Sequence, residues 1–405
     1  MDGTRTKPGW KVGTIGILGT LLLPALAQAQ VTIEYVAHAC FVVQSPAGVR
    51  VVIDPYNNHR WLGYSFPASL PADALLITHP HYDHDANYYW GPTIPVLRAP
   101  GRYALGDVQI KGIRGKHADP YGKDFGQVNT IWMVEVGGLR IAHLGDNGPL
   151  SEAALRALGR VDVLMMPIDG QYHILSREEI EAIRSRLRPR VTIPMHYRIP
   201  GLSELPRSLG PLEPWLAGRQ NVIRLETNRA LLTPDKLPAS EQIFVFPPSP
   251  AVKPWSRSLR QAWEERRIAR ELLQSESPTR LQEALQHWRR AAELAPEVIY
   301  FRWQWGKVLA DAGRQEEAIR VLERGLAAAA QTDWEHRMRA RALLAHLYQA
   351  AGQAELAARQ YRLILTRSYR LALRQQAREF LSSPAPATLL PTRGLCGGGT
   401  RPPLL

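Results

Sequence analysis

Cysteine is almost absent from this chain of 405 residues, where only Cys40 and Cys396 occur. Two cysteines placed so far apart exclude a disulfide framework. Acidic residues are also scarce, 37 against 50 basic ones, so the formal charge is +13. The excess is arginine spread along predicted helices and not a dense basic block, which disfavours nucleic-acid binding. With 45% hydrophobic and 21% charged residues, the composition is that of a folded globular protein.

A long apolar run is also missing after residue 30, so no later segment is predicted to span a bilayer. The first 29 residues have the pattern of a secretory signal peptide. Lys7 and Lys11 precede an apolar stretch over 12–27, and Ala27 and Ala29 are small residues at the cleavage positions. We expect an exported, periplasmic protein, with an uncleaved N-terminal membrane anchor as the alternative. There is neither a twin-arginine pair nor a cysteine for lipid attachment.

Short β-type runs alternate with turns through the first half of the chain, and helical patterns enter later. Two helices are predicted, over 151–158 and 177–186, and Ser176 with Glu179 forms a capping box for the second. The predicted strands are 31–35, 40–44, 49–53, 74–78, 108–113, 130–136, 139–144, 163–166 and 191–194. Strands that later mix with helices predict a layered α/β domain over residues 30–246.

The composition changes near residue 247. A proline-rich linker over 247–258 is followed by 259–381, which is rich in Ala, Leu, Arg, Glu and Gln with helical periodicity. A set of small and large residues recurs there after 34 and then 39 positions: Ala284, Trp288, Ala291; Ala318, Leu322, Gly325; Ala357, Tyr361, Ile364. This period resembles tetratricopeptide repeats, with a coincidental helical bundle as the alternative. We expect the tail, 382–405, to be disordered.

The densest group of chemically reactive side chains is Thr78-His79-Pro80-His81-Tyr82-Asp83-His84, directly after a predicted strand. Four metal-binding side chains within six residues are not typical of a packed core. The two histidines can point at one ion, while the adjacent aspartate and histidine turn toward a second. Imidazole nitrogen and carboxylate oxygen favour zinc, and they also suit manganese or iron.

This segment resembles the HxHxDH signature of the metallo-β-lactamase superfamily, and the resemblance covers about residues 31–235. It implies an α/β fold, an αββα sandwich, here followed by an all-α repeat domain. It further implies two divalent metal ions, zinc above all. The implied ligands are His79, His81, Asp83, His84, His117, Asp146 and His196, with Asp146 bridging both ions.

Within the superfamily, the sequence resembles one branch more closely, which contains ascorbate-phosphate lactonase-like hydrolases and lipid phosphodiesterases. The resemblance is carried by Val36-Ala37-His38-Ala39-Cys40-Phe41 and Ile53-Asp54-Pro55. It implies that His38 and Asp54 support the ligands from behind. His143 is a candidate for the same role or a strand histidine without one. His173 is a candidate proton donor or an exposed loop residue.

The predicted function is therefore a metal-dependent hydrolase that acts on an ester, lactone or phosphodiester, with a phosphorylated or lipid-like small molecule as one substrate class. Asp83, Asp146 and His173 are the candidate catalytic residues. The alternative is a periplasmic interaction protein whose repeats bind a protein or peptide partner. A nuclease is disfavoured because no nucleic-acid domain is evident, and a β-lactamase in the narrow sense is disfavoured by the branch resemblance.

Overall fold

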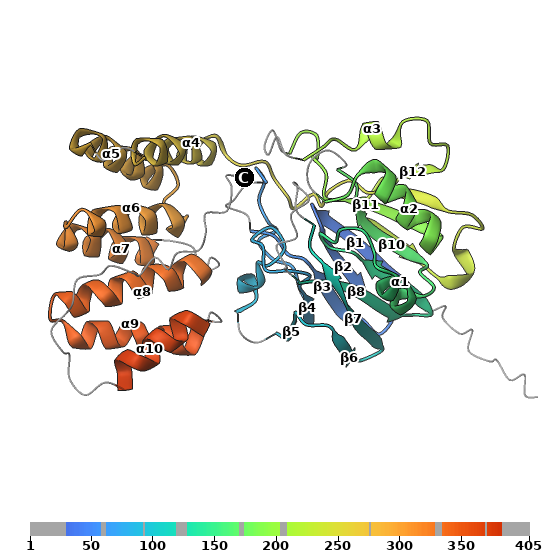
Figure 1. The fold of residues 1–405 in the computed structure, drawn as a ribbon, viewed down its shortest axis with the longest axis horizontal. Coiled ribbons are helices and arrows are strands. Elements are labelled where there is room, and N and C mark those ends of the chain that lie inside the picture. Colours follow the sequence, from blue (N-terminus) through green and yellow to red (C-terminus); the bar gives the residue numbers. More distant parts are fainter. Residues whose placement is uncertain are drawn as a thin grey trace, which may run out of the picture.

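The computed structural model describes residues 30–57, 62–91, 94–118, 128–169, 174–202, 209–274, 277–328, 334–368 and 371–382. The predicted signal segment, His173 and most of the predicted disordered tail lie outside these ranges. Two sheets and their helices form an N-terminal unit, and helices alone form a C-terminal unit (Figure 1).

The first sheet has six strands in the order β13-β1-β2-β3-β4-β5. These strands are β1 (Val31–Ala37), β2 (Cys40–Gln44), β3 (Arg50–Ile53), β4 (Ala74–Leu76), β5 (Val96–Leu97) and β13 (Arg229–Leu232). The antiparallel β2–β3 hairpin turns at Ser45, whose backbone NH donates to Val49 O at 2.9 Å. β3 and β4 run parallel, with Ile53 opposite Leu76, so Asp54 and Thr78 leave the sheet at the same edge.

The second sheet has eight strands in the order β12-β14-β11-β10-β9-β8-β7-β6. They are β6 (Gly101–Leu105), β7 (Val108–Lys116), β8 (Val128–Val136), β9 (Leu139–His143), β10 (Val163–Pro167), β11 (Val191–Met195), β12 (Val222–Arg224) and β14 (Gln242–Val245). Every residue of β10 and β11 is buried. Continuous apolar runs of this kind are typical of parallel strands covered on both faces, and β9, β10 and β11 do pair in parallel.

Helices α1 (Glu152–Leu158), α2 (Arg177–Leu187) and α3 (Glu213–Leu216) belong to this unit, and Figure 1 shows α1 and α2 beside the eight-stranded sheet. The predicted capping box is confirmed: Ser176 accepts from the backbone NH of Glu179, and Glu179 accepts from that of Ser176. One hydrophobic core, which includes Trp132, Phe41 and Met165, fills the space between the sheets. The short 3-10 helices η1 (Asn87–Tyr89) and η3 (Pro234–Lys236) lie in connections.

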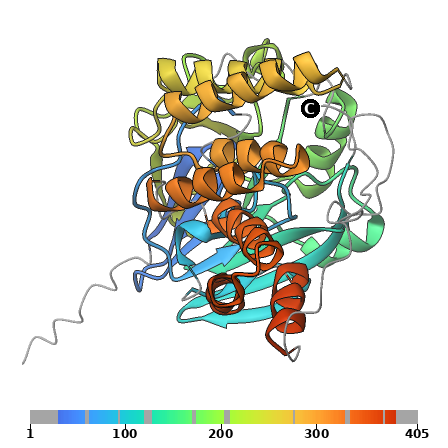
Figure 2. The same cartoon turned by 90° about the vertical axis from the view of Figure 1, so that its left-hand side faces the viewer.

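The C-terminal unit is a series of antiparallel helices with its own hydrophobic core around Trp288 and Phe301. Its helices are α4 (Arg257–Leu272), α5 (Pro278–Leu294), α6 (Ile299–Asp311), α7 (Gln315–Ala328), α8 (Trp334–Ala350), α9 (Ala354–Arg367) and α10 (Leu371–Ser382). Successive helices pack side by side, and Figure 2 shows them stacked in front of the sheets. The all-helical prediction for this region is confirmed.

The repeat pattern has a packing reason at the crossing of α6 and α7. A Cβ on Gly306 would lie 2.8 Å from Cγ of Leu322, and one on Gly325 would lie 2.9 Å from Cβ of Arg302. Glycine is therefore required on both helices for this close approach. Gly313, which precedes α7, has φ 76°, the left-handed conformation of a helix end.

The segment between the two units lies against the N-terminal unit. Ser249 N donates to Val36 O at 2.8 Å, Ser65 N donates to Lys253 O at 2.8 Å, and Trp255 N donates to Gly63 O at 2.9 Å. Helix α8 also contacts η1. Within the described residues, no helix is both long and apolar enough to cross a membrane.

Candidate metal centre

The residues of the predicted metal site meet where several strands end. Asp146 follows β9, Asp169 follows β10 and His196 follows β11, and the carboxyl ends of these parallel strands lie at one edge of the sheet. The loop that carries His79 and His84 follows β4 of the other sheet. The sandwich therefore collects side chains that are more than 100 positions apart in the sequence.

Seven of the predicted ligand residues and His38 fall into two groups in which the candidate ligand atoms lie within 4.8 Å of one another. The first group is His79, His81, His117 and Asp146. The second group is His38, Asp83, His84 and His196. All are buried except His81, which is half-buried and opens the first group toward the surface.

Asp146 lies between the groups. Its Oδ2 atom is close to four histidine Nε2 atoms: 3.6 Å from His79, 3.8 Å from His117, 3.3 Å from His84 and 3.4 Å from His196. The first two belong to the first group and the last two to the second. A single carboxylate oxygen at these distances is positioned to bridge two cations.

Asp54 supports ligands of both groups from behind. Its Oδ2 accepts from His84 Nδ1 at 2.8 Å and from Thr78 Oγ1 at 2.7 Å, and Oδ1 accepts from Thr78 N at 2.8 Å. Thr78 Oγ1 in turn lies 3.0 Å from His79 Nδ1. These bonds keep the Nδ1 protons in place and turn the Nε2 lone pairs of both rings toward the centre. Asp54, a predicted supporting residue, thus lies beside ligand residues of both groups.

Asp169 plays the same part for His196, whose Nδ1 lies 3.2 Å from Asp169 Oδ2. The sequence reasoning missed Asp169 and Thr78. In the segment after β10, the sequence pattern singled out only His173. The available signal was a carboxylate directly after a buried strand.

The donor set fits a metal centre on the structure's own evidence. Within the described part of the chain, the Nε2 atoms of His79, His84 and His117 are buried and make no hydrogen bond. Buried polar atoms are almost always satisfied, so these convergent nitrogens are of the kind that a metal ion would satisfy. Nitrogen and carboxylate donors of this kind are those of zinc, manganese and iron sites.

Charge coupling within the centre is strong. Burial acts to raise the pKa of Asp146, but His196 and His84 outweigh it and hold that pKa well below its usual range. Burial acts to lower the pKa of His196, but Asp146 and Asp169 raise it to about 10. Burial lowers the pKa of His38 to about 3, which keeps this ring neutral. The carboxylates thus draw positive charge to this place, and a bound cation would replace the protons.

The backbone is strained at the centre. His38, Asp54 and His196 have φ of 58°, 48° and 55°, a region that non-glycine residues rarely adopt. Gly145, before the bridging Asp146, has φ 58°, and a Cβ there would lie 2.6 Å from Thr78. The surrounding structure holds these residues in strained conformations, and the strained positions cluster at the two ligand groups.

The structure places the predicted supporting residues His38 and His143 differently, and it does not describe the candidate proton donor His173. His38 lies within the second group, with Nε2 3.3 Å from Asp83 Oδ2, so it is placed for direct ligation as well as for support. His143 Nε2 lies 2.9 Å from Ala39 O, and Nδ1 accepts from Gly145 N at 3.1 Å. His143 therefore shapes the turn before Asp146. The position of His173 lies outside the described residues.

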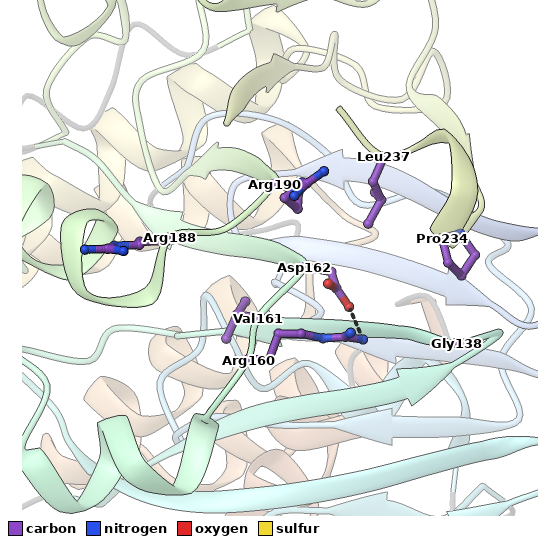
Figure 3. Close-up of a pocket in the computed structure, with 8 residues that line it drawn as sticks. All are labelled: Gly138, Arg160, Val161, Asp162, Arg188, Arg190, Pro234 and Leu237. Atoms are coloured by element: carbon purple, nitrogen blue, oxygen red, sulfur yellow. Dashed lines mark hydrogen bonds and ion pairs between the residues drawn. The ribbon is translucent and has the colours of Figure 1, made fainter. Parts of the chain in front are cut away.

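A cavity of about 360 Å³ lies at the opposite ends of β9, β10 and β11 (Figure 3). It is lined by Gly138, Arg160, Val161, Asp162, Arg188, Arg190, Pro234 and Leu237. Arg160 pairs with Asp162 at 3.1 Å. None of these residues belongs to either ligand group, so this cavity is separate from the metal centre.

Comparison with known proteins agrees with this centre. Residues 32–196, which hold His38 and both ligand groups, match the family described as beta-lactamase superfamily domain. Residues 32–196 form a domain of that superfamily. Its metallo-β-lactamase fold with paired His/Asp groups makes this part of the chain a metal-dependent hydrolase domain.

Relatives and solved structures are similar to separate parts of the chain. A UPF0173 metal-dependent hydrolase of Myxococcus xanthus is 28% identical over 205 residues, which are 43% of this chain and 72% of the relative. The crystal structure of a Thermotoga maritima protein, described as a candidate zinc-dependent hydrolase of the metallo-β-lactamase superfamily, is also similar. It is 26% identical, with a TM-score of 0.41. The match covers 53% of this chain and 98% of that structure.

The helical region matches differently. Residues 258–350 match the family described as regulator of microtubule dynamics protein 1-3. A tetratricopeptide-repeat protein of Thermus thermophilus is 24% identical with a TM-score of 0.25, over 31% of this chain and 63% of that structure. The metallo-β-lactamase domain and the helical region thus have separate sets of relatives.

Proposed function

We propose that this chain is an exported, periplasmic hydrolase with two divalent metal ions, zinc foremost and manganese or iron as alternatives. The proposed substrate is a small molecule with an ester, lactone or phosphodiester bond, phosphorylated or lipid-like. The observation that carries the dinuclear centre is the position of Asp146 Oδ2, 3.3 to 3.8 Å from histidine nitrogens of both groups. Export is supported by the N-terminal sequence pattern.

The residues of the centre would have different roles in hydrolysis. Metal ions bound here would supply an acidified water and stabilise developing negative charge. His79, His81 and His117 would hold one ion, and Asp83, His84 and His196 would hold the other. Asp146 would contribute its carboxylate to both. The carboxylate of Asp83 is the group placed to receive a proton within the centre, and Asp146 would act there as a ligand. The formal charge of +13 favours an anionic substrate.

Turnover of bis(p-nitrophenyl) phosphate and of a simple lactone tests this proposal. We expect zinc- or manganese-loaded protein to cleave at least one of these probes, and EDTA to abolish the activity until metal is restored. The control is the EDTA-treated protein after dialysis, whose circular dichroism should show that it stays folded. Folded protein that takes up no metal on titration would refute the proposal.

The second candidate is an interaction protein that acts through its helices. It is favoured by the separate hydrophobic core of the helical region. A strain that lacks the gene, complemented with variants, distinguishes the two functions. We expect His79→Ala to fail to complement. If His79→Ala complements fully while a chain without residues 259–381 does not, the repeats carry the function and the enzymatic proposal is wrong.

A further inference from the structure

The two ligand groups of the metal centre differ in the donors that they offer. The first group has three histidines and one carboxylate, that of Asp146. The second group has three histidines and the carboxylate of Asp83, and Asp146 Oδ2 also lies 3.3 Å from its His84 Nε2 and 3.4 Å from its His196 Nε2. The second group therefore has one more carboxylate near it than the first. Additional negative charge around a cation raises the affinity of a site.

Carboxylates also lie behind two histidines of the second group. Asp54 Oδ2 is 2.8 Å from His84 Nδ1, and Asp169 Oδ2 is 3.2 Å from His196 Nδ1. Both carboxylates are buried. A carboxylate in this position fixes the histidine ring and raises the basicity of its other nitrogen, which strengthens metal binding.

The histidines of the first group have weaker support. His79 Nδ1 lies 3.0 Å from the hydroxyl of Thr78, so the charge of Asp54 reaches this ring only through a neutral group. Within the part of the chain that the structure describes, Nδ1 of His117 makes no hydrogen bond. We therefore expect the first group to bind its ion less tightly than the second.

The two groups differ in access to solvent as well. His38, Asp83, His84 and His196 of the second group are all buried, whereas His81 of the first group is only half-buried. Closed sites typically retain their metal as part of the structure, and catalytic sites keep one position open to water and substrate. The second group therefore has the features of a site that retains its ion, and the first has those of a site that exchanges it.

We propose that the second group binds the first metal ion that the chain takes up and retains it, and that filling of the first group then activates the hydrolase. This inference rests on the proposed hydrolase function and makes metal supply its regulator. A chain with a single ion holds it in the buried group and is inactive. The first group, which is open at His81, takes up its ion last and loses it first.

Titration of EDTA-treated protein with zinc, in competition with a chelator, tests the order. We expect two binding steps whose dissociation constants differ by at least about tenfold, the lower limit for support of a ligand from behind. Turnover of bis(p-nitrophenyl) phosphate should stay close to zero until one ion is bound and should rise with the second. Two neighbouring cations repel each other, so separate steps alone do not show which group fills first.

A pair of variants identifies the group that fills first. His117→Ala removes a donor of the first group, so it should abolish the weaker step and leave the tighter one unchanged. Asp169→Asn keeps an oxygen for His196 Nδ1 but removes the negative charge, so it should weaken the tighter step by about tenfold to 100-fold. Circular dichroism of the metal-free variants checks the fold. If His117→Ala does not fold, His81→Ala repeats the test at the half-buried member of the same group.

Loss of the tighter step in His117→Ala or His81→Ala, with the weaker step kept, would overturn the proposed order. An unaltered tighter step in Asp169→Asn would do the same, and so would turnover that rises in proportion to metal from the first ion onward. In each of these cases wild type still binds metal and cleaves the probe, so the hydrolase proposal stands. Wild-type protein that binds no metal would instead refute the hydrolase proposal, and this inference with it.

Discussion

Asp146→Asn is expected to reduce the bound metal from close to two ions per chain to one or fewer, and to lower turnover by more than about 100-fold. Loss of a residue that only orients a metal ligand lowers metal affinity or activity by about tenfold to 100-fold. Asp146 is itself a proposed ligand, so its loss should have a larger effect. Its Oδ2 lies 3.3 Å from His84 Nε2 and 3.6 Å from His79 Nε2. An amide has the same shape but lacks the negative charge that two neighbouring cations require. Mass spectrometry of metal content and steady-state kinetics on the same preparation measure both effects.

Asp162→Asn is the control for Asp146→Asn. Asp162 is also a buried carboxylate of the eight-stranded sheet, where it accepts from Arg140 N at 2.9 Å, but it belongs to neither ligand group. It should lower stability while leaving the metal content unchanged. If Asp146→Asn retains two ions and full turnover, the bridging position assigned to Asp146 is wrong.

Asp54→Asn is expected to weaken metal binding by about tenfold to 100-fold, the range for residues that orient ligands. It should also lower the free energy of unfolding by roughly 2 to 4 kcal/mol, because hydrogen bonds to a buried charge are worth more than neutral ones. The three donors on Asp54, from His84 and Thr78, would face an amide that can accept at only one atom. Competition with a chelator gives the metal affinity, and urea unfolding of metal-free protein gives the stability.

Asp73→Asn provides the comparison for Asp54→Asn. Asp73 accepts from the backbone NH of Arg50 at 2.8 Å at the exposed start of the same pair of strands. It should change metal affinity by less than about twofold. Equal metal affinity in Asp54→Asn and wild type would show that the bond to His84 Nδ1 does not matter for the centre.

Much of the fold could be predicted because local patterns there agree with the tertiary structure. The β-type runs of β1 and β2, the capping box at Ser176 and the apolar runs of β10 and β11 each depend on nearby residues. Short strands such as β5, β12 and β14 were missed. Their residues have little pattern of their own and become strands only because a neighbouring strand supplies hydrogen bonds.

The candidate site shows the same division. The spacing of the side chains from His79 to His84 is typical of a metal site, so the sequence alone predicts the chemistry of this segment. Asp169 could not be assigned, because a single carboxylate after a strand is common and only the fold brings it to His196.

The sequence by itself determined the two-part organisation, the ligand types and the presence of a helical repeat region. These features depend on composition, period and short spacing, which are local. Only the tertiary structure decided which candidate ligands lie together in one group, that His38 joins the second group and that Asp54 serves both groups. The physical reason is that hydrogen bonds and metal-ligand distances are set in space, where the ends of β4, β9 and β11 meet although they are far apart along the chain.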